Sequence, residues 1–344
     1  MISLLQKLIA IPSLSRDESA VADFLESWLS EEGLAPHRCG NNLWCSHGKG
    51  PAVLLDAHID TVKPVAGWTR DPFTPTVEGG RLFGLGSNDD GASVVAIIDA
   101  YRRLTAKPQP YTLILSLSAE EETSGRKGLE ISMAEMEAAC GPIAFGICGE
   151  PTSLEMAVAE KGLMVLDCTV TGVAGHAARD TGVNAIYKAI TAIEWFRNKQ
   201  FEKVSPLLGP VKMTVTQIQA GTQHNVIPDN CTFVVDIRSN GLYTNQELLE
   251  LIQAEAPCRA EARSTRLCGS SIAEDHPLVQ RARQLGIPTV GSPTLSNQAL
   301  CRFPTVKIGP GDSVRSHTAD EYVNTADIGK ATDIYVQLLD GLQV

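Results

Sequence analysis

Three short, almost uninterrupted apolar runs constrain the fold of this sequence more than any other feature. They cover residues 52–60, 112–119 and 143–150. Between the first two, residues 91–104 carry apolar side chains at helical spacing. Continuous apolarity over such short segments is typical of strands that are covered on both faces, as in parallel sheets. Strands that alternate with helices therefore predict an α/β fold, with a mostly parallel sheet sandwiched by helices.

From about residue 161 the pattern changes to one that predicts a separate α+β domain. Its predicted elements, in chain order, are a strand at 163–172, a helix at 184–197, strands at 211–219 and 231–239, a helix at 244–256 and a strand at 258–264. This order is that of the ferredoxin-like split motif. Predicted helix 276–286 and apolar run 301–309 then resume the first pattern. We expect a catalytic domain of residues 1–160 and 272–344, with an inserted domain of residues 161–271.

Two capping boxes are predicted, in which a hydroxyl and a glutamate three residues later close the start of a helix. Ser15 with Glu18 precedes the amphipathic segment 19–29, and Thr244 with Glu247 precedes the second helix of the inserted domain.

The charge balance excludes several classes of partner. The sequence has 29 Lys and Arg against 40 Asp and Glu, a net charge of −11. Nucleic-acid binders need a basic face, so we expect no nucleic acid and no membrane partner. No apolar run is long enough for a membrane span. Gln6 and Lys7 interrupt the apolar start, and no cleavage site follows, so we expect a cytoplasmic protein.

The nine cysteines are scattered and never spaced C-x-x-C. This pattern predicts no zinc ribbon, no thioredoxin motif and no disulfide framework. We expect small buried thiols in a reducing compartment.

Each apolar run of the predicted catalytic domain leads to side chains that can bind a metal. Ligands of open α/β sheets bind outside the carboxyl ends of the strands, so these side chains are expected to meet at one edge. They are His58, the glutamates at 120, 121 and 122, Glu150 and, after a Gly-Pro-Gly turn, His317. Asp60 follows His58 by two residues, so we expect its carboxylate on the same side of the strand, accepting a hydrogen bond from the second ring nitrogen.

The glycine-rich turn before Asp89 does not predict a nucleotide site. Gly84 and Gly86 lack the third glycine of a dinucleotide fingerprint, and no P-loop motif is present. Asp89 is interpreted as a carboxylate that bridges two metal ions. Two histidines and several carboxylates without a cysteine suit zinc, cobalt or manganese. Paired ions about 3.5–4 Å apart activate a bridging water and polarise a carbonyl.

Five motifs, in this order, carry a resemblance to a known family: HID, GLGSND, AEEE, GEPT and GPG…SH. The sequence resembles the zinc-dependent amidohydrolase family that contains acetylornithine deacetylase, succinyl-diaminopimelate desuccinylase, aminoacylase and glutamate carboxypeptidases. The resemblance runs along the whole chain and implies that the inserted domain serves dimerisation or acts as a lid. It is strongest to the acetylornithine or succinylornithine deacetylase branch, some relatives of which act on N-acyl-citrulline. It implies a deacetylase of N-acyl amino acids in arginine biosynthesis.

The resemblance also implies roles for single residues. The implied ligands of two divalent ions, Zn²⁺ or else Co²⁺ or Mn²⁺, are the bridging Asp89, with His58 and Glu150 on one ion and Glu122 and His317 on the other. Glu121 would be the general base. In a homodimer, His176 would reach the partner subunit's active site and stabilise the oxyanion. Asn225 and Arg238 would hold the carboxylate of the substrate.

Two departures from the family pattern bear on specificity. Asp90-Gly91 stands where the family usually places a lysine two residues after the bridging aspartate, and Ala57 replaces a glycine before the first metal histidine.

Several alternatives stay open at this stage. A dipeptidase, an aminoacylase or a desuccinylase would use the same metals, and neither acetyl against succinyl nor ornithine against citrulline is decided. A metal-binding protein without activity would not need the general base, and no G-x-S-x-G elbow indicates a serine hydrolase. Side chains alternate at the end of a strand, so the roles of Glu121 and Glu122 depend on their register, and Glu120 is given none.

Overall fold

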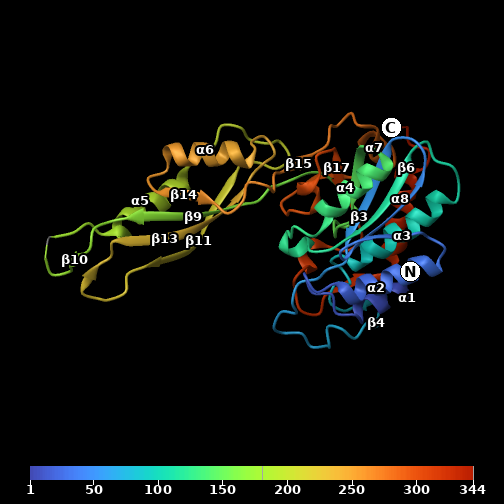
Figure 1. Ribbon diagram of the computed structural model, residues 1–344, viewed down its shortest axis with the longest axis horizontal. Coiled ribbons are helices and arrows are strands. Elements are labelled where there is room, and N and C mark those ends of the chain that lie inside the picture. The colour runs from blue at the N-terminus through green and yellow to red at the C-terminus, as the bar shows by residue number, and fades with distance from the viewer. Residues whose placement is uncertain (180, 344) are drawn as a thin grey trace. The chain divides into compact units, whose positions relative to one another are not determined.

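The computed structural model describes residues 1–179 and 181–343, and the chain divides into two compact units (Figure 1). The first unit consists of Met1–Val158, Ser271–Val290 and Ser296–Val344. The second consists of Ala159–Ser270 and Gly291–Leu295. Each has a hydrophobic core of its own.

The first unit is built on a nine-stranded sheet in the order β1-β2-β6-β3-β7-β17-β8-β15, with β16 on β8. The strands are β1 (His37–Cys39), β2 (Asn42–Gly48), β3 (Ala52–His58), β6 (Thr112–Ser118), β7 (Ile143–Cys148), β8 (Met156–Glu160), β15 (Ser270–Ser271), β16 (Thr289–Ser292) and β17 (Thr305–Lys307). The four central strands, β6, β3, β7 and β17, run parallel. The predicted α/β fold with a mostly parallel sheet is confirmed.

Helices cover both faces of this sheet. They are α1 (Ile2–Ile9), α2 (Ser19–Glu31), α3 (Gly91–Thr105), α4 (Leu129–Cys140), α7 (Pro277–Gln284) and α8 (Thr325–Leu339). Every residue of β3 is buried. Its side chains alternate, so that Val53 and Leu55 join the core beneath α3 while Leu54 joins the smaller core beneath α4. This double coverage explains the uninterrupted apolar run.

A small antiparallel sheet lies beside the chain that leads to Asp89. Its strands are β4 (Thr76–Glu78), β5 (Arg81–Phe83) and β18 (Tyr322–Asn324), in the order β18-β5-β4. Strand β5 precedes the glycine-rich turn, and β18 begins just after Glu321. The pairing therefore brings Glu321 beside the turn, where its carbonyl accepts the N–H of Gly84 at 3.1 Å.

One predicted capping box is confirmed and the other is wrong. Thr244 and Glu247 form the reciprocal box at the start of α6. Helix α2 has no side-chain cap, because the Ser15 hydroxyl donates instead to the carboxylate of Asp60 at 2.6 Å. Glu18 accepts the N–H of Glu120 at 3.2 Å and ties the helix start to the end of β6.

The second unit has the predicted β-α-β-β-α-β order. Its elements are β9 (Met164–Thr171), α5 (Ala185–Asn198), β11 (Lys212–Ala220), β13 (Asn230–Arg238), α6 (Asn245–Glu255) and β14 (Arg259–Ala262). The antiparallel sheet has the order β11-β13-β9-β14, and α5 and α6 share its core. A separate ribbon of β10 (Gly175–His176) and β12 (Val226–Ile227) was not predicted.

Within residues 1–179 and 181–343, none of the helices combines the length and the apolar character needed to cross a membrane. No disulfide joins cysteines in this part of the chain.

Candidate metal centre

His58 is the last residue of β3, and its imidazole is held through both ring nitrogens. Nδ1 lies 3.0 Å from the main-chain oxygen of Asp60, so Nδ1 carries the proton and donates it there. Nε2 faces Asp89, whose Oδ1 lies 3.1 Å away. Burial lowers the pKa of His58, but the hydrogen bonds to Asp60 and Asp89 raise it well above its ordinary value. A metal ion that displaces the proton of Nε2 would find this nitrogen already oriented as a ligand.

The carboxylate of Asp60 has a different place from the one expected. Strand β3 ends at His58, so Asp60 lies beyond the strand. Nδ1 of His58 is 3.5 Å from Oδ1 of Asp60, which is farther than the 3.0 Å to the main-chain oxygen of Asp60. The carboxylate instead accepts the main-chain N–H groups of Glu121 at 3.0 Å and Glu122 at 3.2 Å, besides the hydroxyl of Ser15. Burial raises the pKa of Asp60. The interactions with His58, with the Ser15 hydroxyl and with the N–H of Glu121 lower it by more, so the pKa of Asp60 lies below its ordinary value.

The three consecutive glutamates are separated by a turn and not by strand alternation. Strand β6 ends at Ser118, and residues Glu121–Thr123 form a 3₁₀ helix. Glu120 takes a left-handed conformation with φ +56°, and its carboxylate accepts the N–H of Lys127 at 3.3 Å. The expectation of alternating side chains is wrong here, because the chain leaves the sheet before the glutamates begin.

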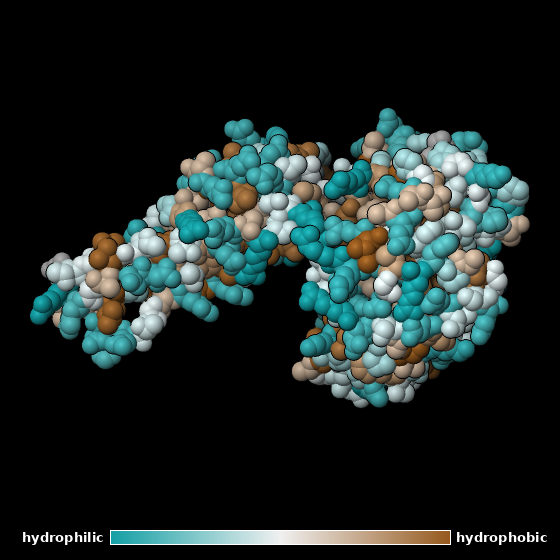
Figure 2. All heavy atoms as spheres, viewed as in Figure 1, coloured by the Kyte–Doolittle hydropathy of each residue, from teal (hydrophilic) through white to brown (hydrophobic). Residues whose placement is uncertain are grey.

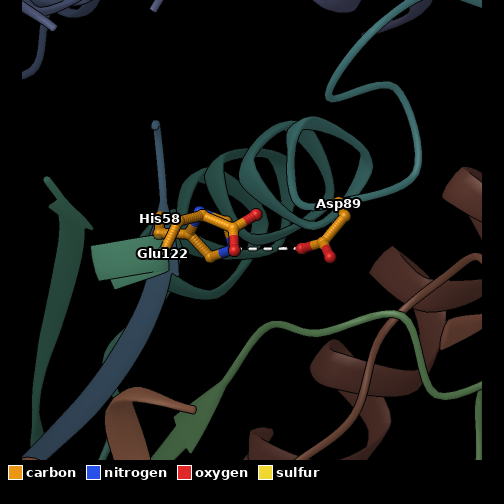
Figure 3. Close-up of side chains that lie close together, drawn as sticks. All are labelled: His58, Asp89 and Glu122. Carbon is orange, nitrogen blue, oxygen red and sulfur yellow. Dashed lines mark hydrogen bonds and ion pairs between the residues drawn. The ribbon is translucent and has the colours of Figure 1, made fainter. Parts of the chain in front are cut away.

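Asp89 lies between the two histidines, just before α3 begins. Its Oδ1 faces His58, and its Oδ2 is 3.8 Å from Nε2 of His317. The carboxylate of Glu122 contacts the same Nε2 at 2.9 and 3.0 Å. Ligand atoms of His58, Asp89 and Glu122 lie within 4.8 Å of one another. Figure 3 shows these three side chains pointing toward one another.

Negative charge accumulates around Glu121. Its Oε2 lies 4.0 Å from Nε2 of His58. Burial raises the pKa of Glu121 well above its ordinary value, and the charges of Glu150 and Glu122 raise it further, against the lowering effect of His58. Glu150 lies two residues beyond β7, which pairs in parallel with β3. The Glu122 hydrogen bond raises the pKa of His317 to about 9.

These residues fit a divalent cation. The cluster offers imidazole nitrogens and carboxylate oxygens from β3, the turn before α3, the 3₁₀ helix and the segment before β18. Such donors suit zinc, cobalt or manganese. A cation would offset the repulsion that several half-buried carboxylates otherwise exert on one another.

Two residues that sequence reasoning missed support this cluster. The carboxylate of Glu321, 2% exposed, accepts the N–H groups of Gly86, Asn88 and Asp89. Burial raises the pKa of Glu321 to about 8, although the three donors lower it. The side-chain amide of Asn88 donates to the main-chain oxygen of Asp312 and accepts the main-chain N–H of the same residue. Neither position carries a local signal, because both act on backbone that is distant in sequence.

The predicted substrate residues lie in the second unit, in two separate places. His176 in β10 is paired with Val226, and the carbonyl of Asn225 accepts the N–H of Ala177, so His176 and Asn225 are neighbours. Arg238 ends β13 and forms a bidentate ion pair with Asp236 at 2.8 and 3.1 Å.

Comparison with known proteins decides the family. Residues 54–341 match the model of peptidase family M20/M25/M40. The chain is 32% identical to acetylornithine deacetylase of Proteus mirabilis, over 98% of this chain and 96% of that protein. It is 31% identical to the enzyme of the same name from Photorhabdus laumondii, with the same coverage of both. The chain belongs to the M20/M25/M40 peptidase family.

Solved structures agree with the M20 fold. Aminopeptidase PepT from Bacillus cereus superposes with a TM-score of 0.77 at 18% identity, over 98% of this chain and 97% of that one. A dinuclear metal-binding M20 peptidase from Bacillus subtilis gives 0.74 at 18% identity, over 98% and 96%. As an M20 member the chain is a metal-dependent amidohydrolase, which confirms the predicted family and the expectation of an enzyme.

Proposed function

We propose that this protein hydrolyses the amide bond of an N-acyl amino acid in the cytoplasm, as a step of arginine biosynthesis. The proposed substrate is N2-acetyl-L-ornithine, or the N-succinyl-ornithine or N-acyl-citrulline counterpart. The products are the free amino acid and the carboxylate of the acyl group. Two relatives named acetylornithine deacetylase, matched over nearly their whole length, support this choice of substrate.

The proposed ligands of two divalent ions, Zn²⁺ by their donor chemistry, are His58, Asp89, Glu122, Glu150 and His317. When bound, the ions would polarise the scissile carbonyl and lower the pKa of a water molecule. Asp89 suits the bridging position, because its two oxygens face two different histidines.

The placement of Glu121 is the observation that carries the proposal. Its side chain is 10% exposed, and its Oε2 lies 4.0 Å from Nε2 of His58, a proposed ligand nitrogen. The main-chain N–H of Glu121 donates to the carboxylate of Asp60, which anchors the residue. Burial and neighbouring carboxylates raise its pKa. We assign to Glu121 the role of taking a proton from the attacking water and passing it to the leaving nitrogen. A protein that only stored metal would not need this group.

The separation of the substrate residues favours a role for two subunits. His176 and Asn225 lie near the start of β13, whereas Arg238 is its last residue. The nine residues from Asn230 to Arg238, at roughly 3.4 Å per residue, put about 27 Å between the two ends. Asn225 and Arg238 of one chain therefore do not hold one carboxylate together. We propose that His176 and Asn225 come from the partner subunit, and that Arg238 also binds the carboxylate of the substrate.

A surface of the second unit suits such a homodimer. Strand β11 is an edge strand of nine residues, and exposed edges readily pair with another chain. Exposed apolar side chains lie on β11 and on the neighbouring α5, including Ile218 at 54%, Tyr187 at 71% and Ile190 at 50%. Figure 2 shows apolar side chains among hydrophilic ones on this unit, near the end that carries β10. We assign dimerisation to this β11–α5 surface.

Turnover of a defined substrate panel tests the proposal. The panel contains N-acetyl and N-succinyl derivatives of ornithine and citrulline, N-succinyl-diaminopimelate, a neutral N-acetyl amino acid and a dipeptide, each with Zn²⁺ or Co²⁺. We expect the highest kcat/KM for one of the ornithine or citrulline derivatives. A higher value for the dipeptide, for the neutral N-acetyl amino acid or for N-succinyl-diaminopimelate would replace the proposed substrate with a peptidase, aminoacylase or desuccinylase assignment.

A further inference from the structure

We infer that Glu321 is a positioning residue, which fixes the main chain of residues 86–89 and thereby places Asp89 for metal binding. The inference rests on the proposed metal site. Glu321 is not one of the proposed ligands, and it lies four residues after His317 in the chain.

Both oxygens of Glu321 are engaged by main-chain donors. Oε2 accepts the N–H of Gly86 at 3.1 Å. Oε1 accepts the N–H of Asn88 at 2.8 Å and that of Asp89 at 2.9 Å. The side chain is 2% exposed, so water does not compete for these donors. Three hydrogen bonds to one buried carboxylate define the path of the turn immediately before the bridging carboxylate.

The turn links β5 to α3 and lies in no helix or strand. Main-chain bonds join Ser87 to Gly84 at 3.1 Å and Gly91 to Gly86 at 2.9 Å, whereas the N–H groups of Gly86, Asn88 and Asp89 donate to Glu321. Gly86 has a φ of +72°, in the left-handed region that favours glycine. Such a segment can adopt several paths unless tertiary contacts select one.

Asn88 provides a second contact to the segment that carries His317. Its Oδ1 accepts the N–H of Asp312 at 2.8 Å, and its Nδ2 donates to the oxygen of Asp312 at 3.1 Å. Residues 86–89 are thus attached before His317, through Asp312, and after it, through Glu321. These two attachments fix the carboxylate of Asp89 relative to the imidazole of His317, which the metal requires.

A purely electrostatic role is the competing explanation. Any carboxylate near two cations raises their affinity, wherever its hydrogen bonds go. Replacement by aspartate separates the two roles, because it keeps the charge but is one methylene too short to reach all three N–H groups. Replacement by glutamine keeps the length but removes the charge. Its NH₂ group would also face a main-chain N–H, from which it cannot accept a hydrogen bond.

The test is metal binding by the full-length protein, stripped with a chelator and titrated with Zn²⁺ or Co²⁺. We expect E321D and E321Q each to lose about 10–100-fold in metal affinity and to change the absorption spectrum of bound Co²⁺. The matched control is D320N, which removes the charge of a half-buried neighbouring carboxylate that bonds Thr69 and has a φ of +54°, where asparagine is well tolerated. We expect D320N to bind metal like the wild type.

Wild-type affinity and spectrum in E321D would overturn the positioning role and leave only the effect of charge. Wild-type behaviour in both Glu321 variants would remove any role in metal binding. A wild-type protein that binds no metal would contradict the proposed function itself, so the two failures are distinguishable.

A measurement on the wild type covers the case in which the variants do not fold. In the stripped protein, the amides of Gly86, Asn88 and Asp89 should exchange slowly with deuterium before any metal is added. Fast exchange that slows only on addition of Zn²⁺ would show that the metal, and not Glu321, orders the turn.

Discussion

The main-chain N–H of Asp89 donates a 2.9 Å hydrogen bond to the carboxylate of Glu321, 232 residues later in the chain. A second buried carboxylate, Asp60, similarly accepts the N–H groups of Glu121 and Glu122. Two segments that carry proposed metal ligands or the proposed base are therefore held by acidic side chains that bind their backbone. In both cases the ligand-bearing segment lies outside regular strands and α-helices.

Replacement of Glu121 by glutamine should abolish turnover and leave the metal in place. The amide cannot accept the proton of the attacking water, so we expect kcat to fall by about 10²–10⁴-fold, the usual contribution of general acid–base catalysis. Metal content, measured by atomic absorption, should stay near that of the wild type. The matched variant is E120Q, whose carboxylate accepts the N–H of Lys127, and it should remain active. Loss of metal together with activity in E121Q would contradict the assignment of this residue as the base.

Replacement of Asp60 by alanine should damage both metal affinity and catalysis. It removes the acceptor of two main-chain N–H groups and a neighbouring charge of His58 in one change. Loss of such supporting contacts commonly costs about 10–100-fold in metal affinity or activity. Calorimetric titration with Zn²⁺ measures the affinity. S15A, which removes the third donor to Asp60 and a 3.3 Å contact with the oxygen of Thr61, serves as the milder control. Equal effects of S15A and D60A would argue against the role of the two main-chain contacts.

The stripped protein should lose stability as the pH rises from about 6.5 to about 9. His317 has a folded-state pKa of about 9, above its usual 6.5. Its stabilising contribution is complete below pH 6.5 and is lost as the pH rises through 9. Burial raises the pKa of Glu321 from its usual 4.5 to about 8, so ionisation of this group destabilises the folded protein increasingly as the pH rises from 4.5 to 8. This change in stability has the same sign as that of His317.

Thermal unfolding of the stripped protein across this pH range measures the effect. With Zn²⁺ bound, His317 is a neutral ligand and the fall should be much smaller. A stripped protein whose melting temperature rises over the same interval would mean that the ion pair of His317 with Glu122 does not contribute.

A charge placed in the β11–α5 surface should separate the subunits. We expect Y187D to shift the protein to a monomer in sedimentation, because burying an unpaired carboxylate in an interface is strongly unfavourable. If His176 acts from the partner subunit, kcat should fall together with the dimer while metal content is kept. The control is V77D, an exposed apolar position at 49% in the first unit, which should alter neither. A fully active Y187D monomer would rule out a trans role for His176.

Replacement of His176 by alanine should lower kcat and leave the metal content unchanged. The imidazole lies in the second unit and is exposed, so it contributes nothing to the proposed ligand set. Removal of one oxyanion donor typically costs about 10²–10³-fold in kcat. Mixing H176A with E121Q should restore part of the activity if His176 acts in trans, since one site of the mixed dimer then has both groups. No recovery in a mixture shown to exchange subunits would place His176 in cis.

The sequence alone was sufficient for the fold class and the family. Continuous apolar runs indicate strands that are buried on both faces of the sheet. The carboxyl ends of parallel strands lie at one edge of the sheet, so His58 and Glu122 could be expected to meet there. These are local rules, which depend on periodicity and strand direction. The capping box at Thr244 was predicted for the same reason, since all its atoms lie within four residues.

The tertiary structure decided how the site is held. The 3₁₀ turn after β6 separated Glu120 from Glu121 and Glu122, where strand alternation did not apply. The tertiary structure also directs the Ser15 hydroxyl toward Asp60 instead of a helix cap, and it brings Glu321 to the turn before Asp89. A buried carboxylate that binds distant backbone leaves no periodic trace, because its partners are N–H groups that every residue but proline carries. Its role becomes visible only when the fold brings the two segments together.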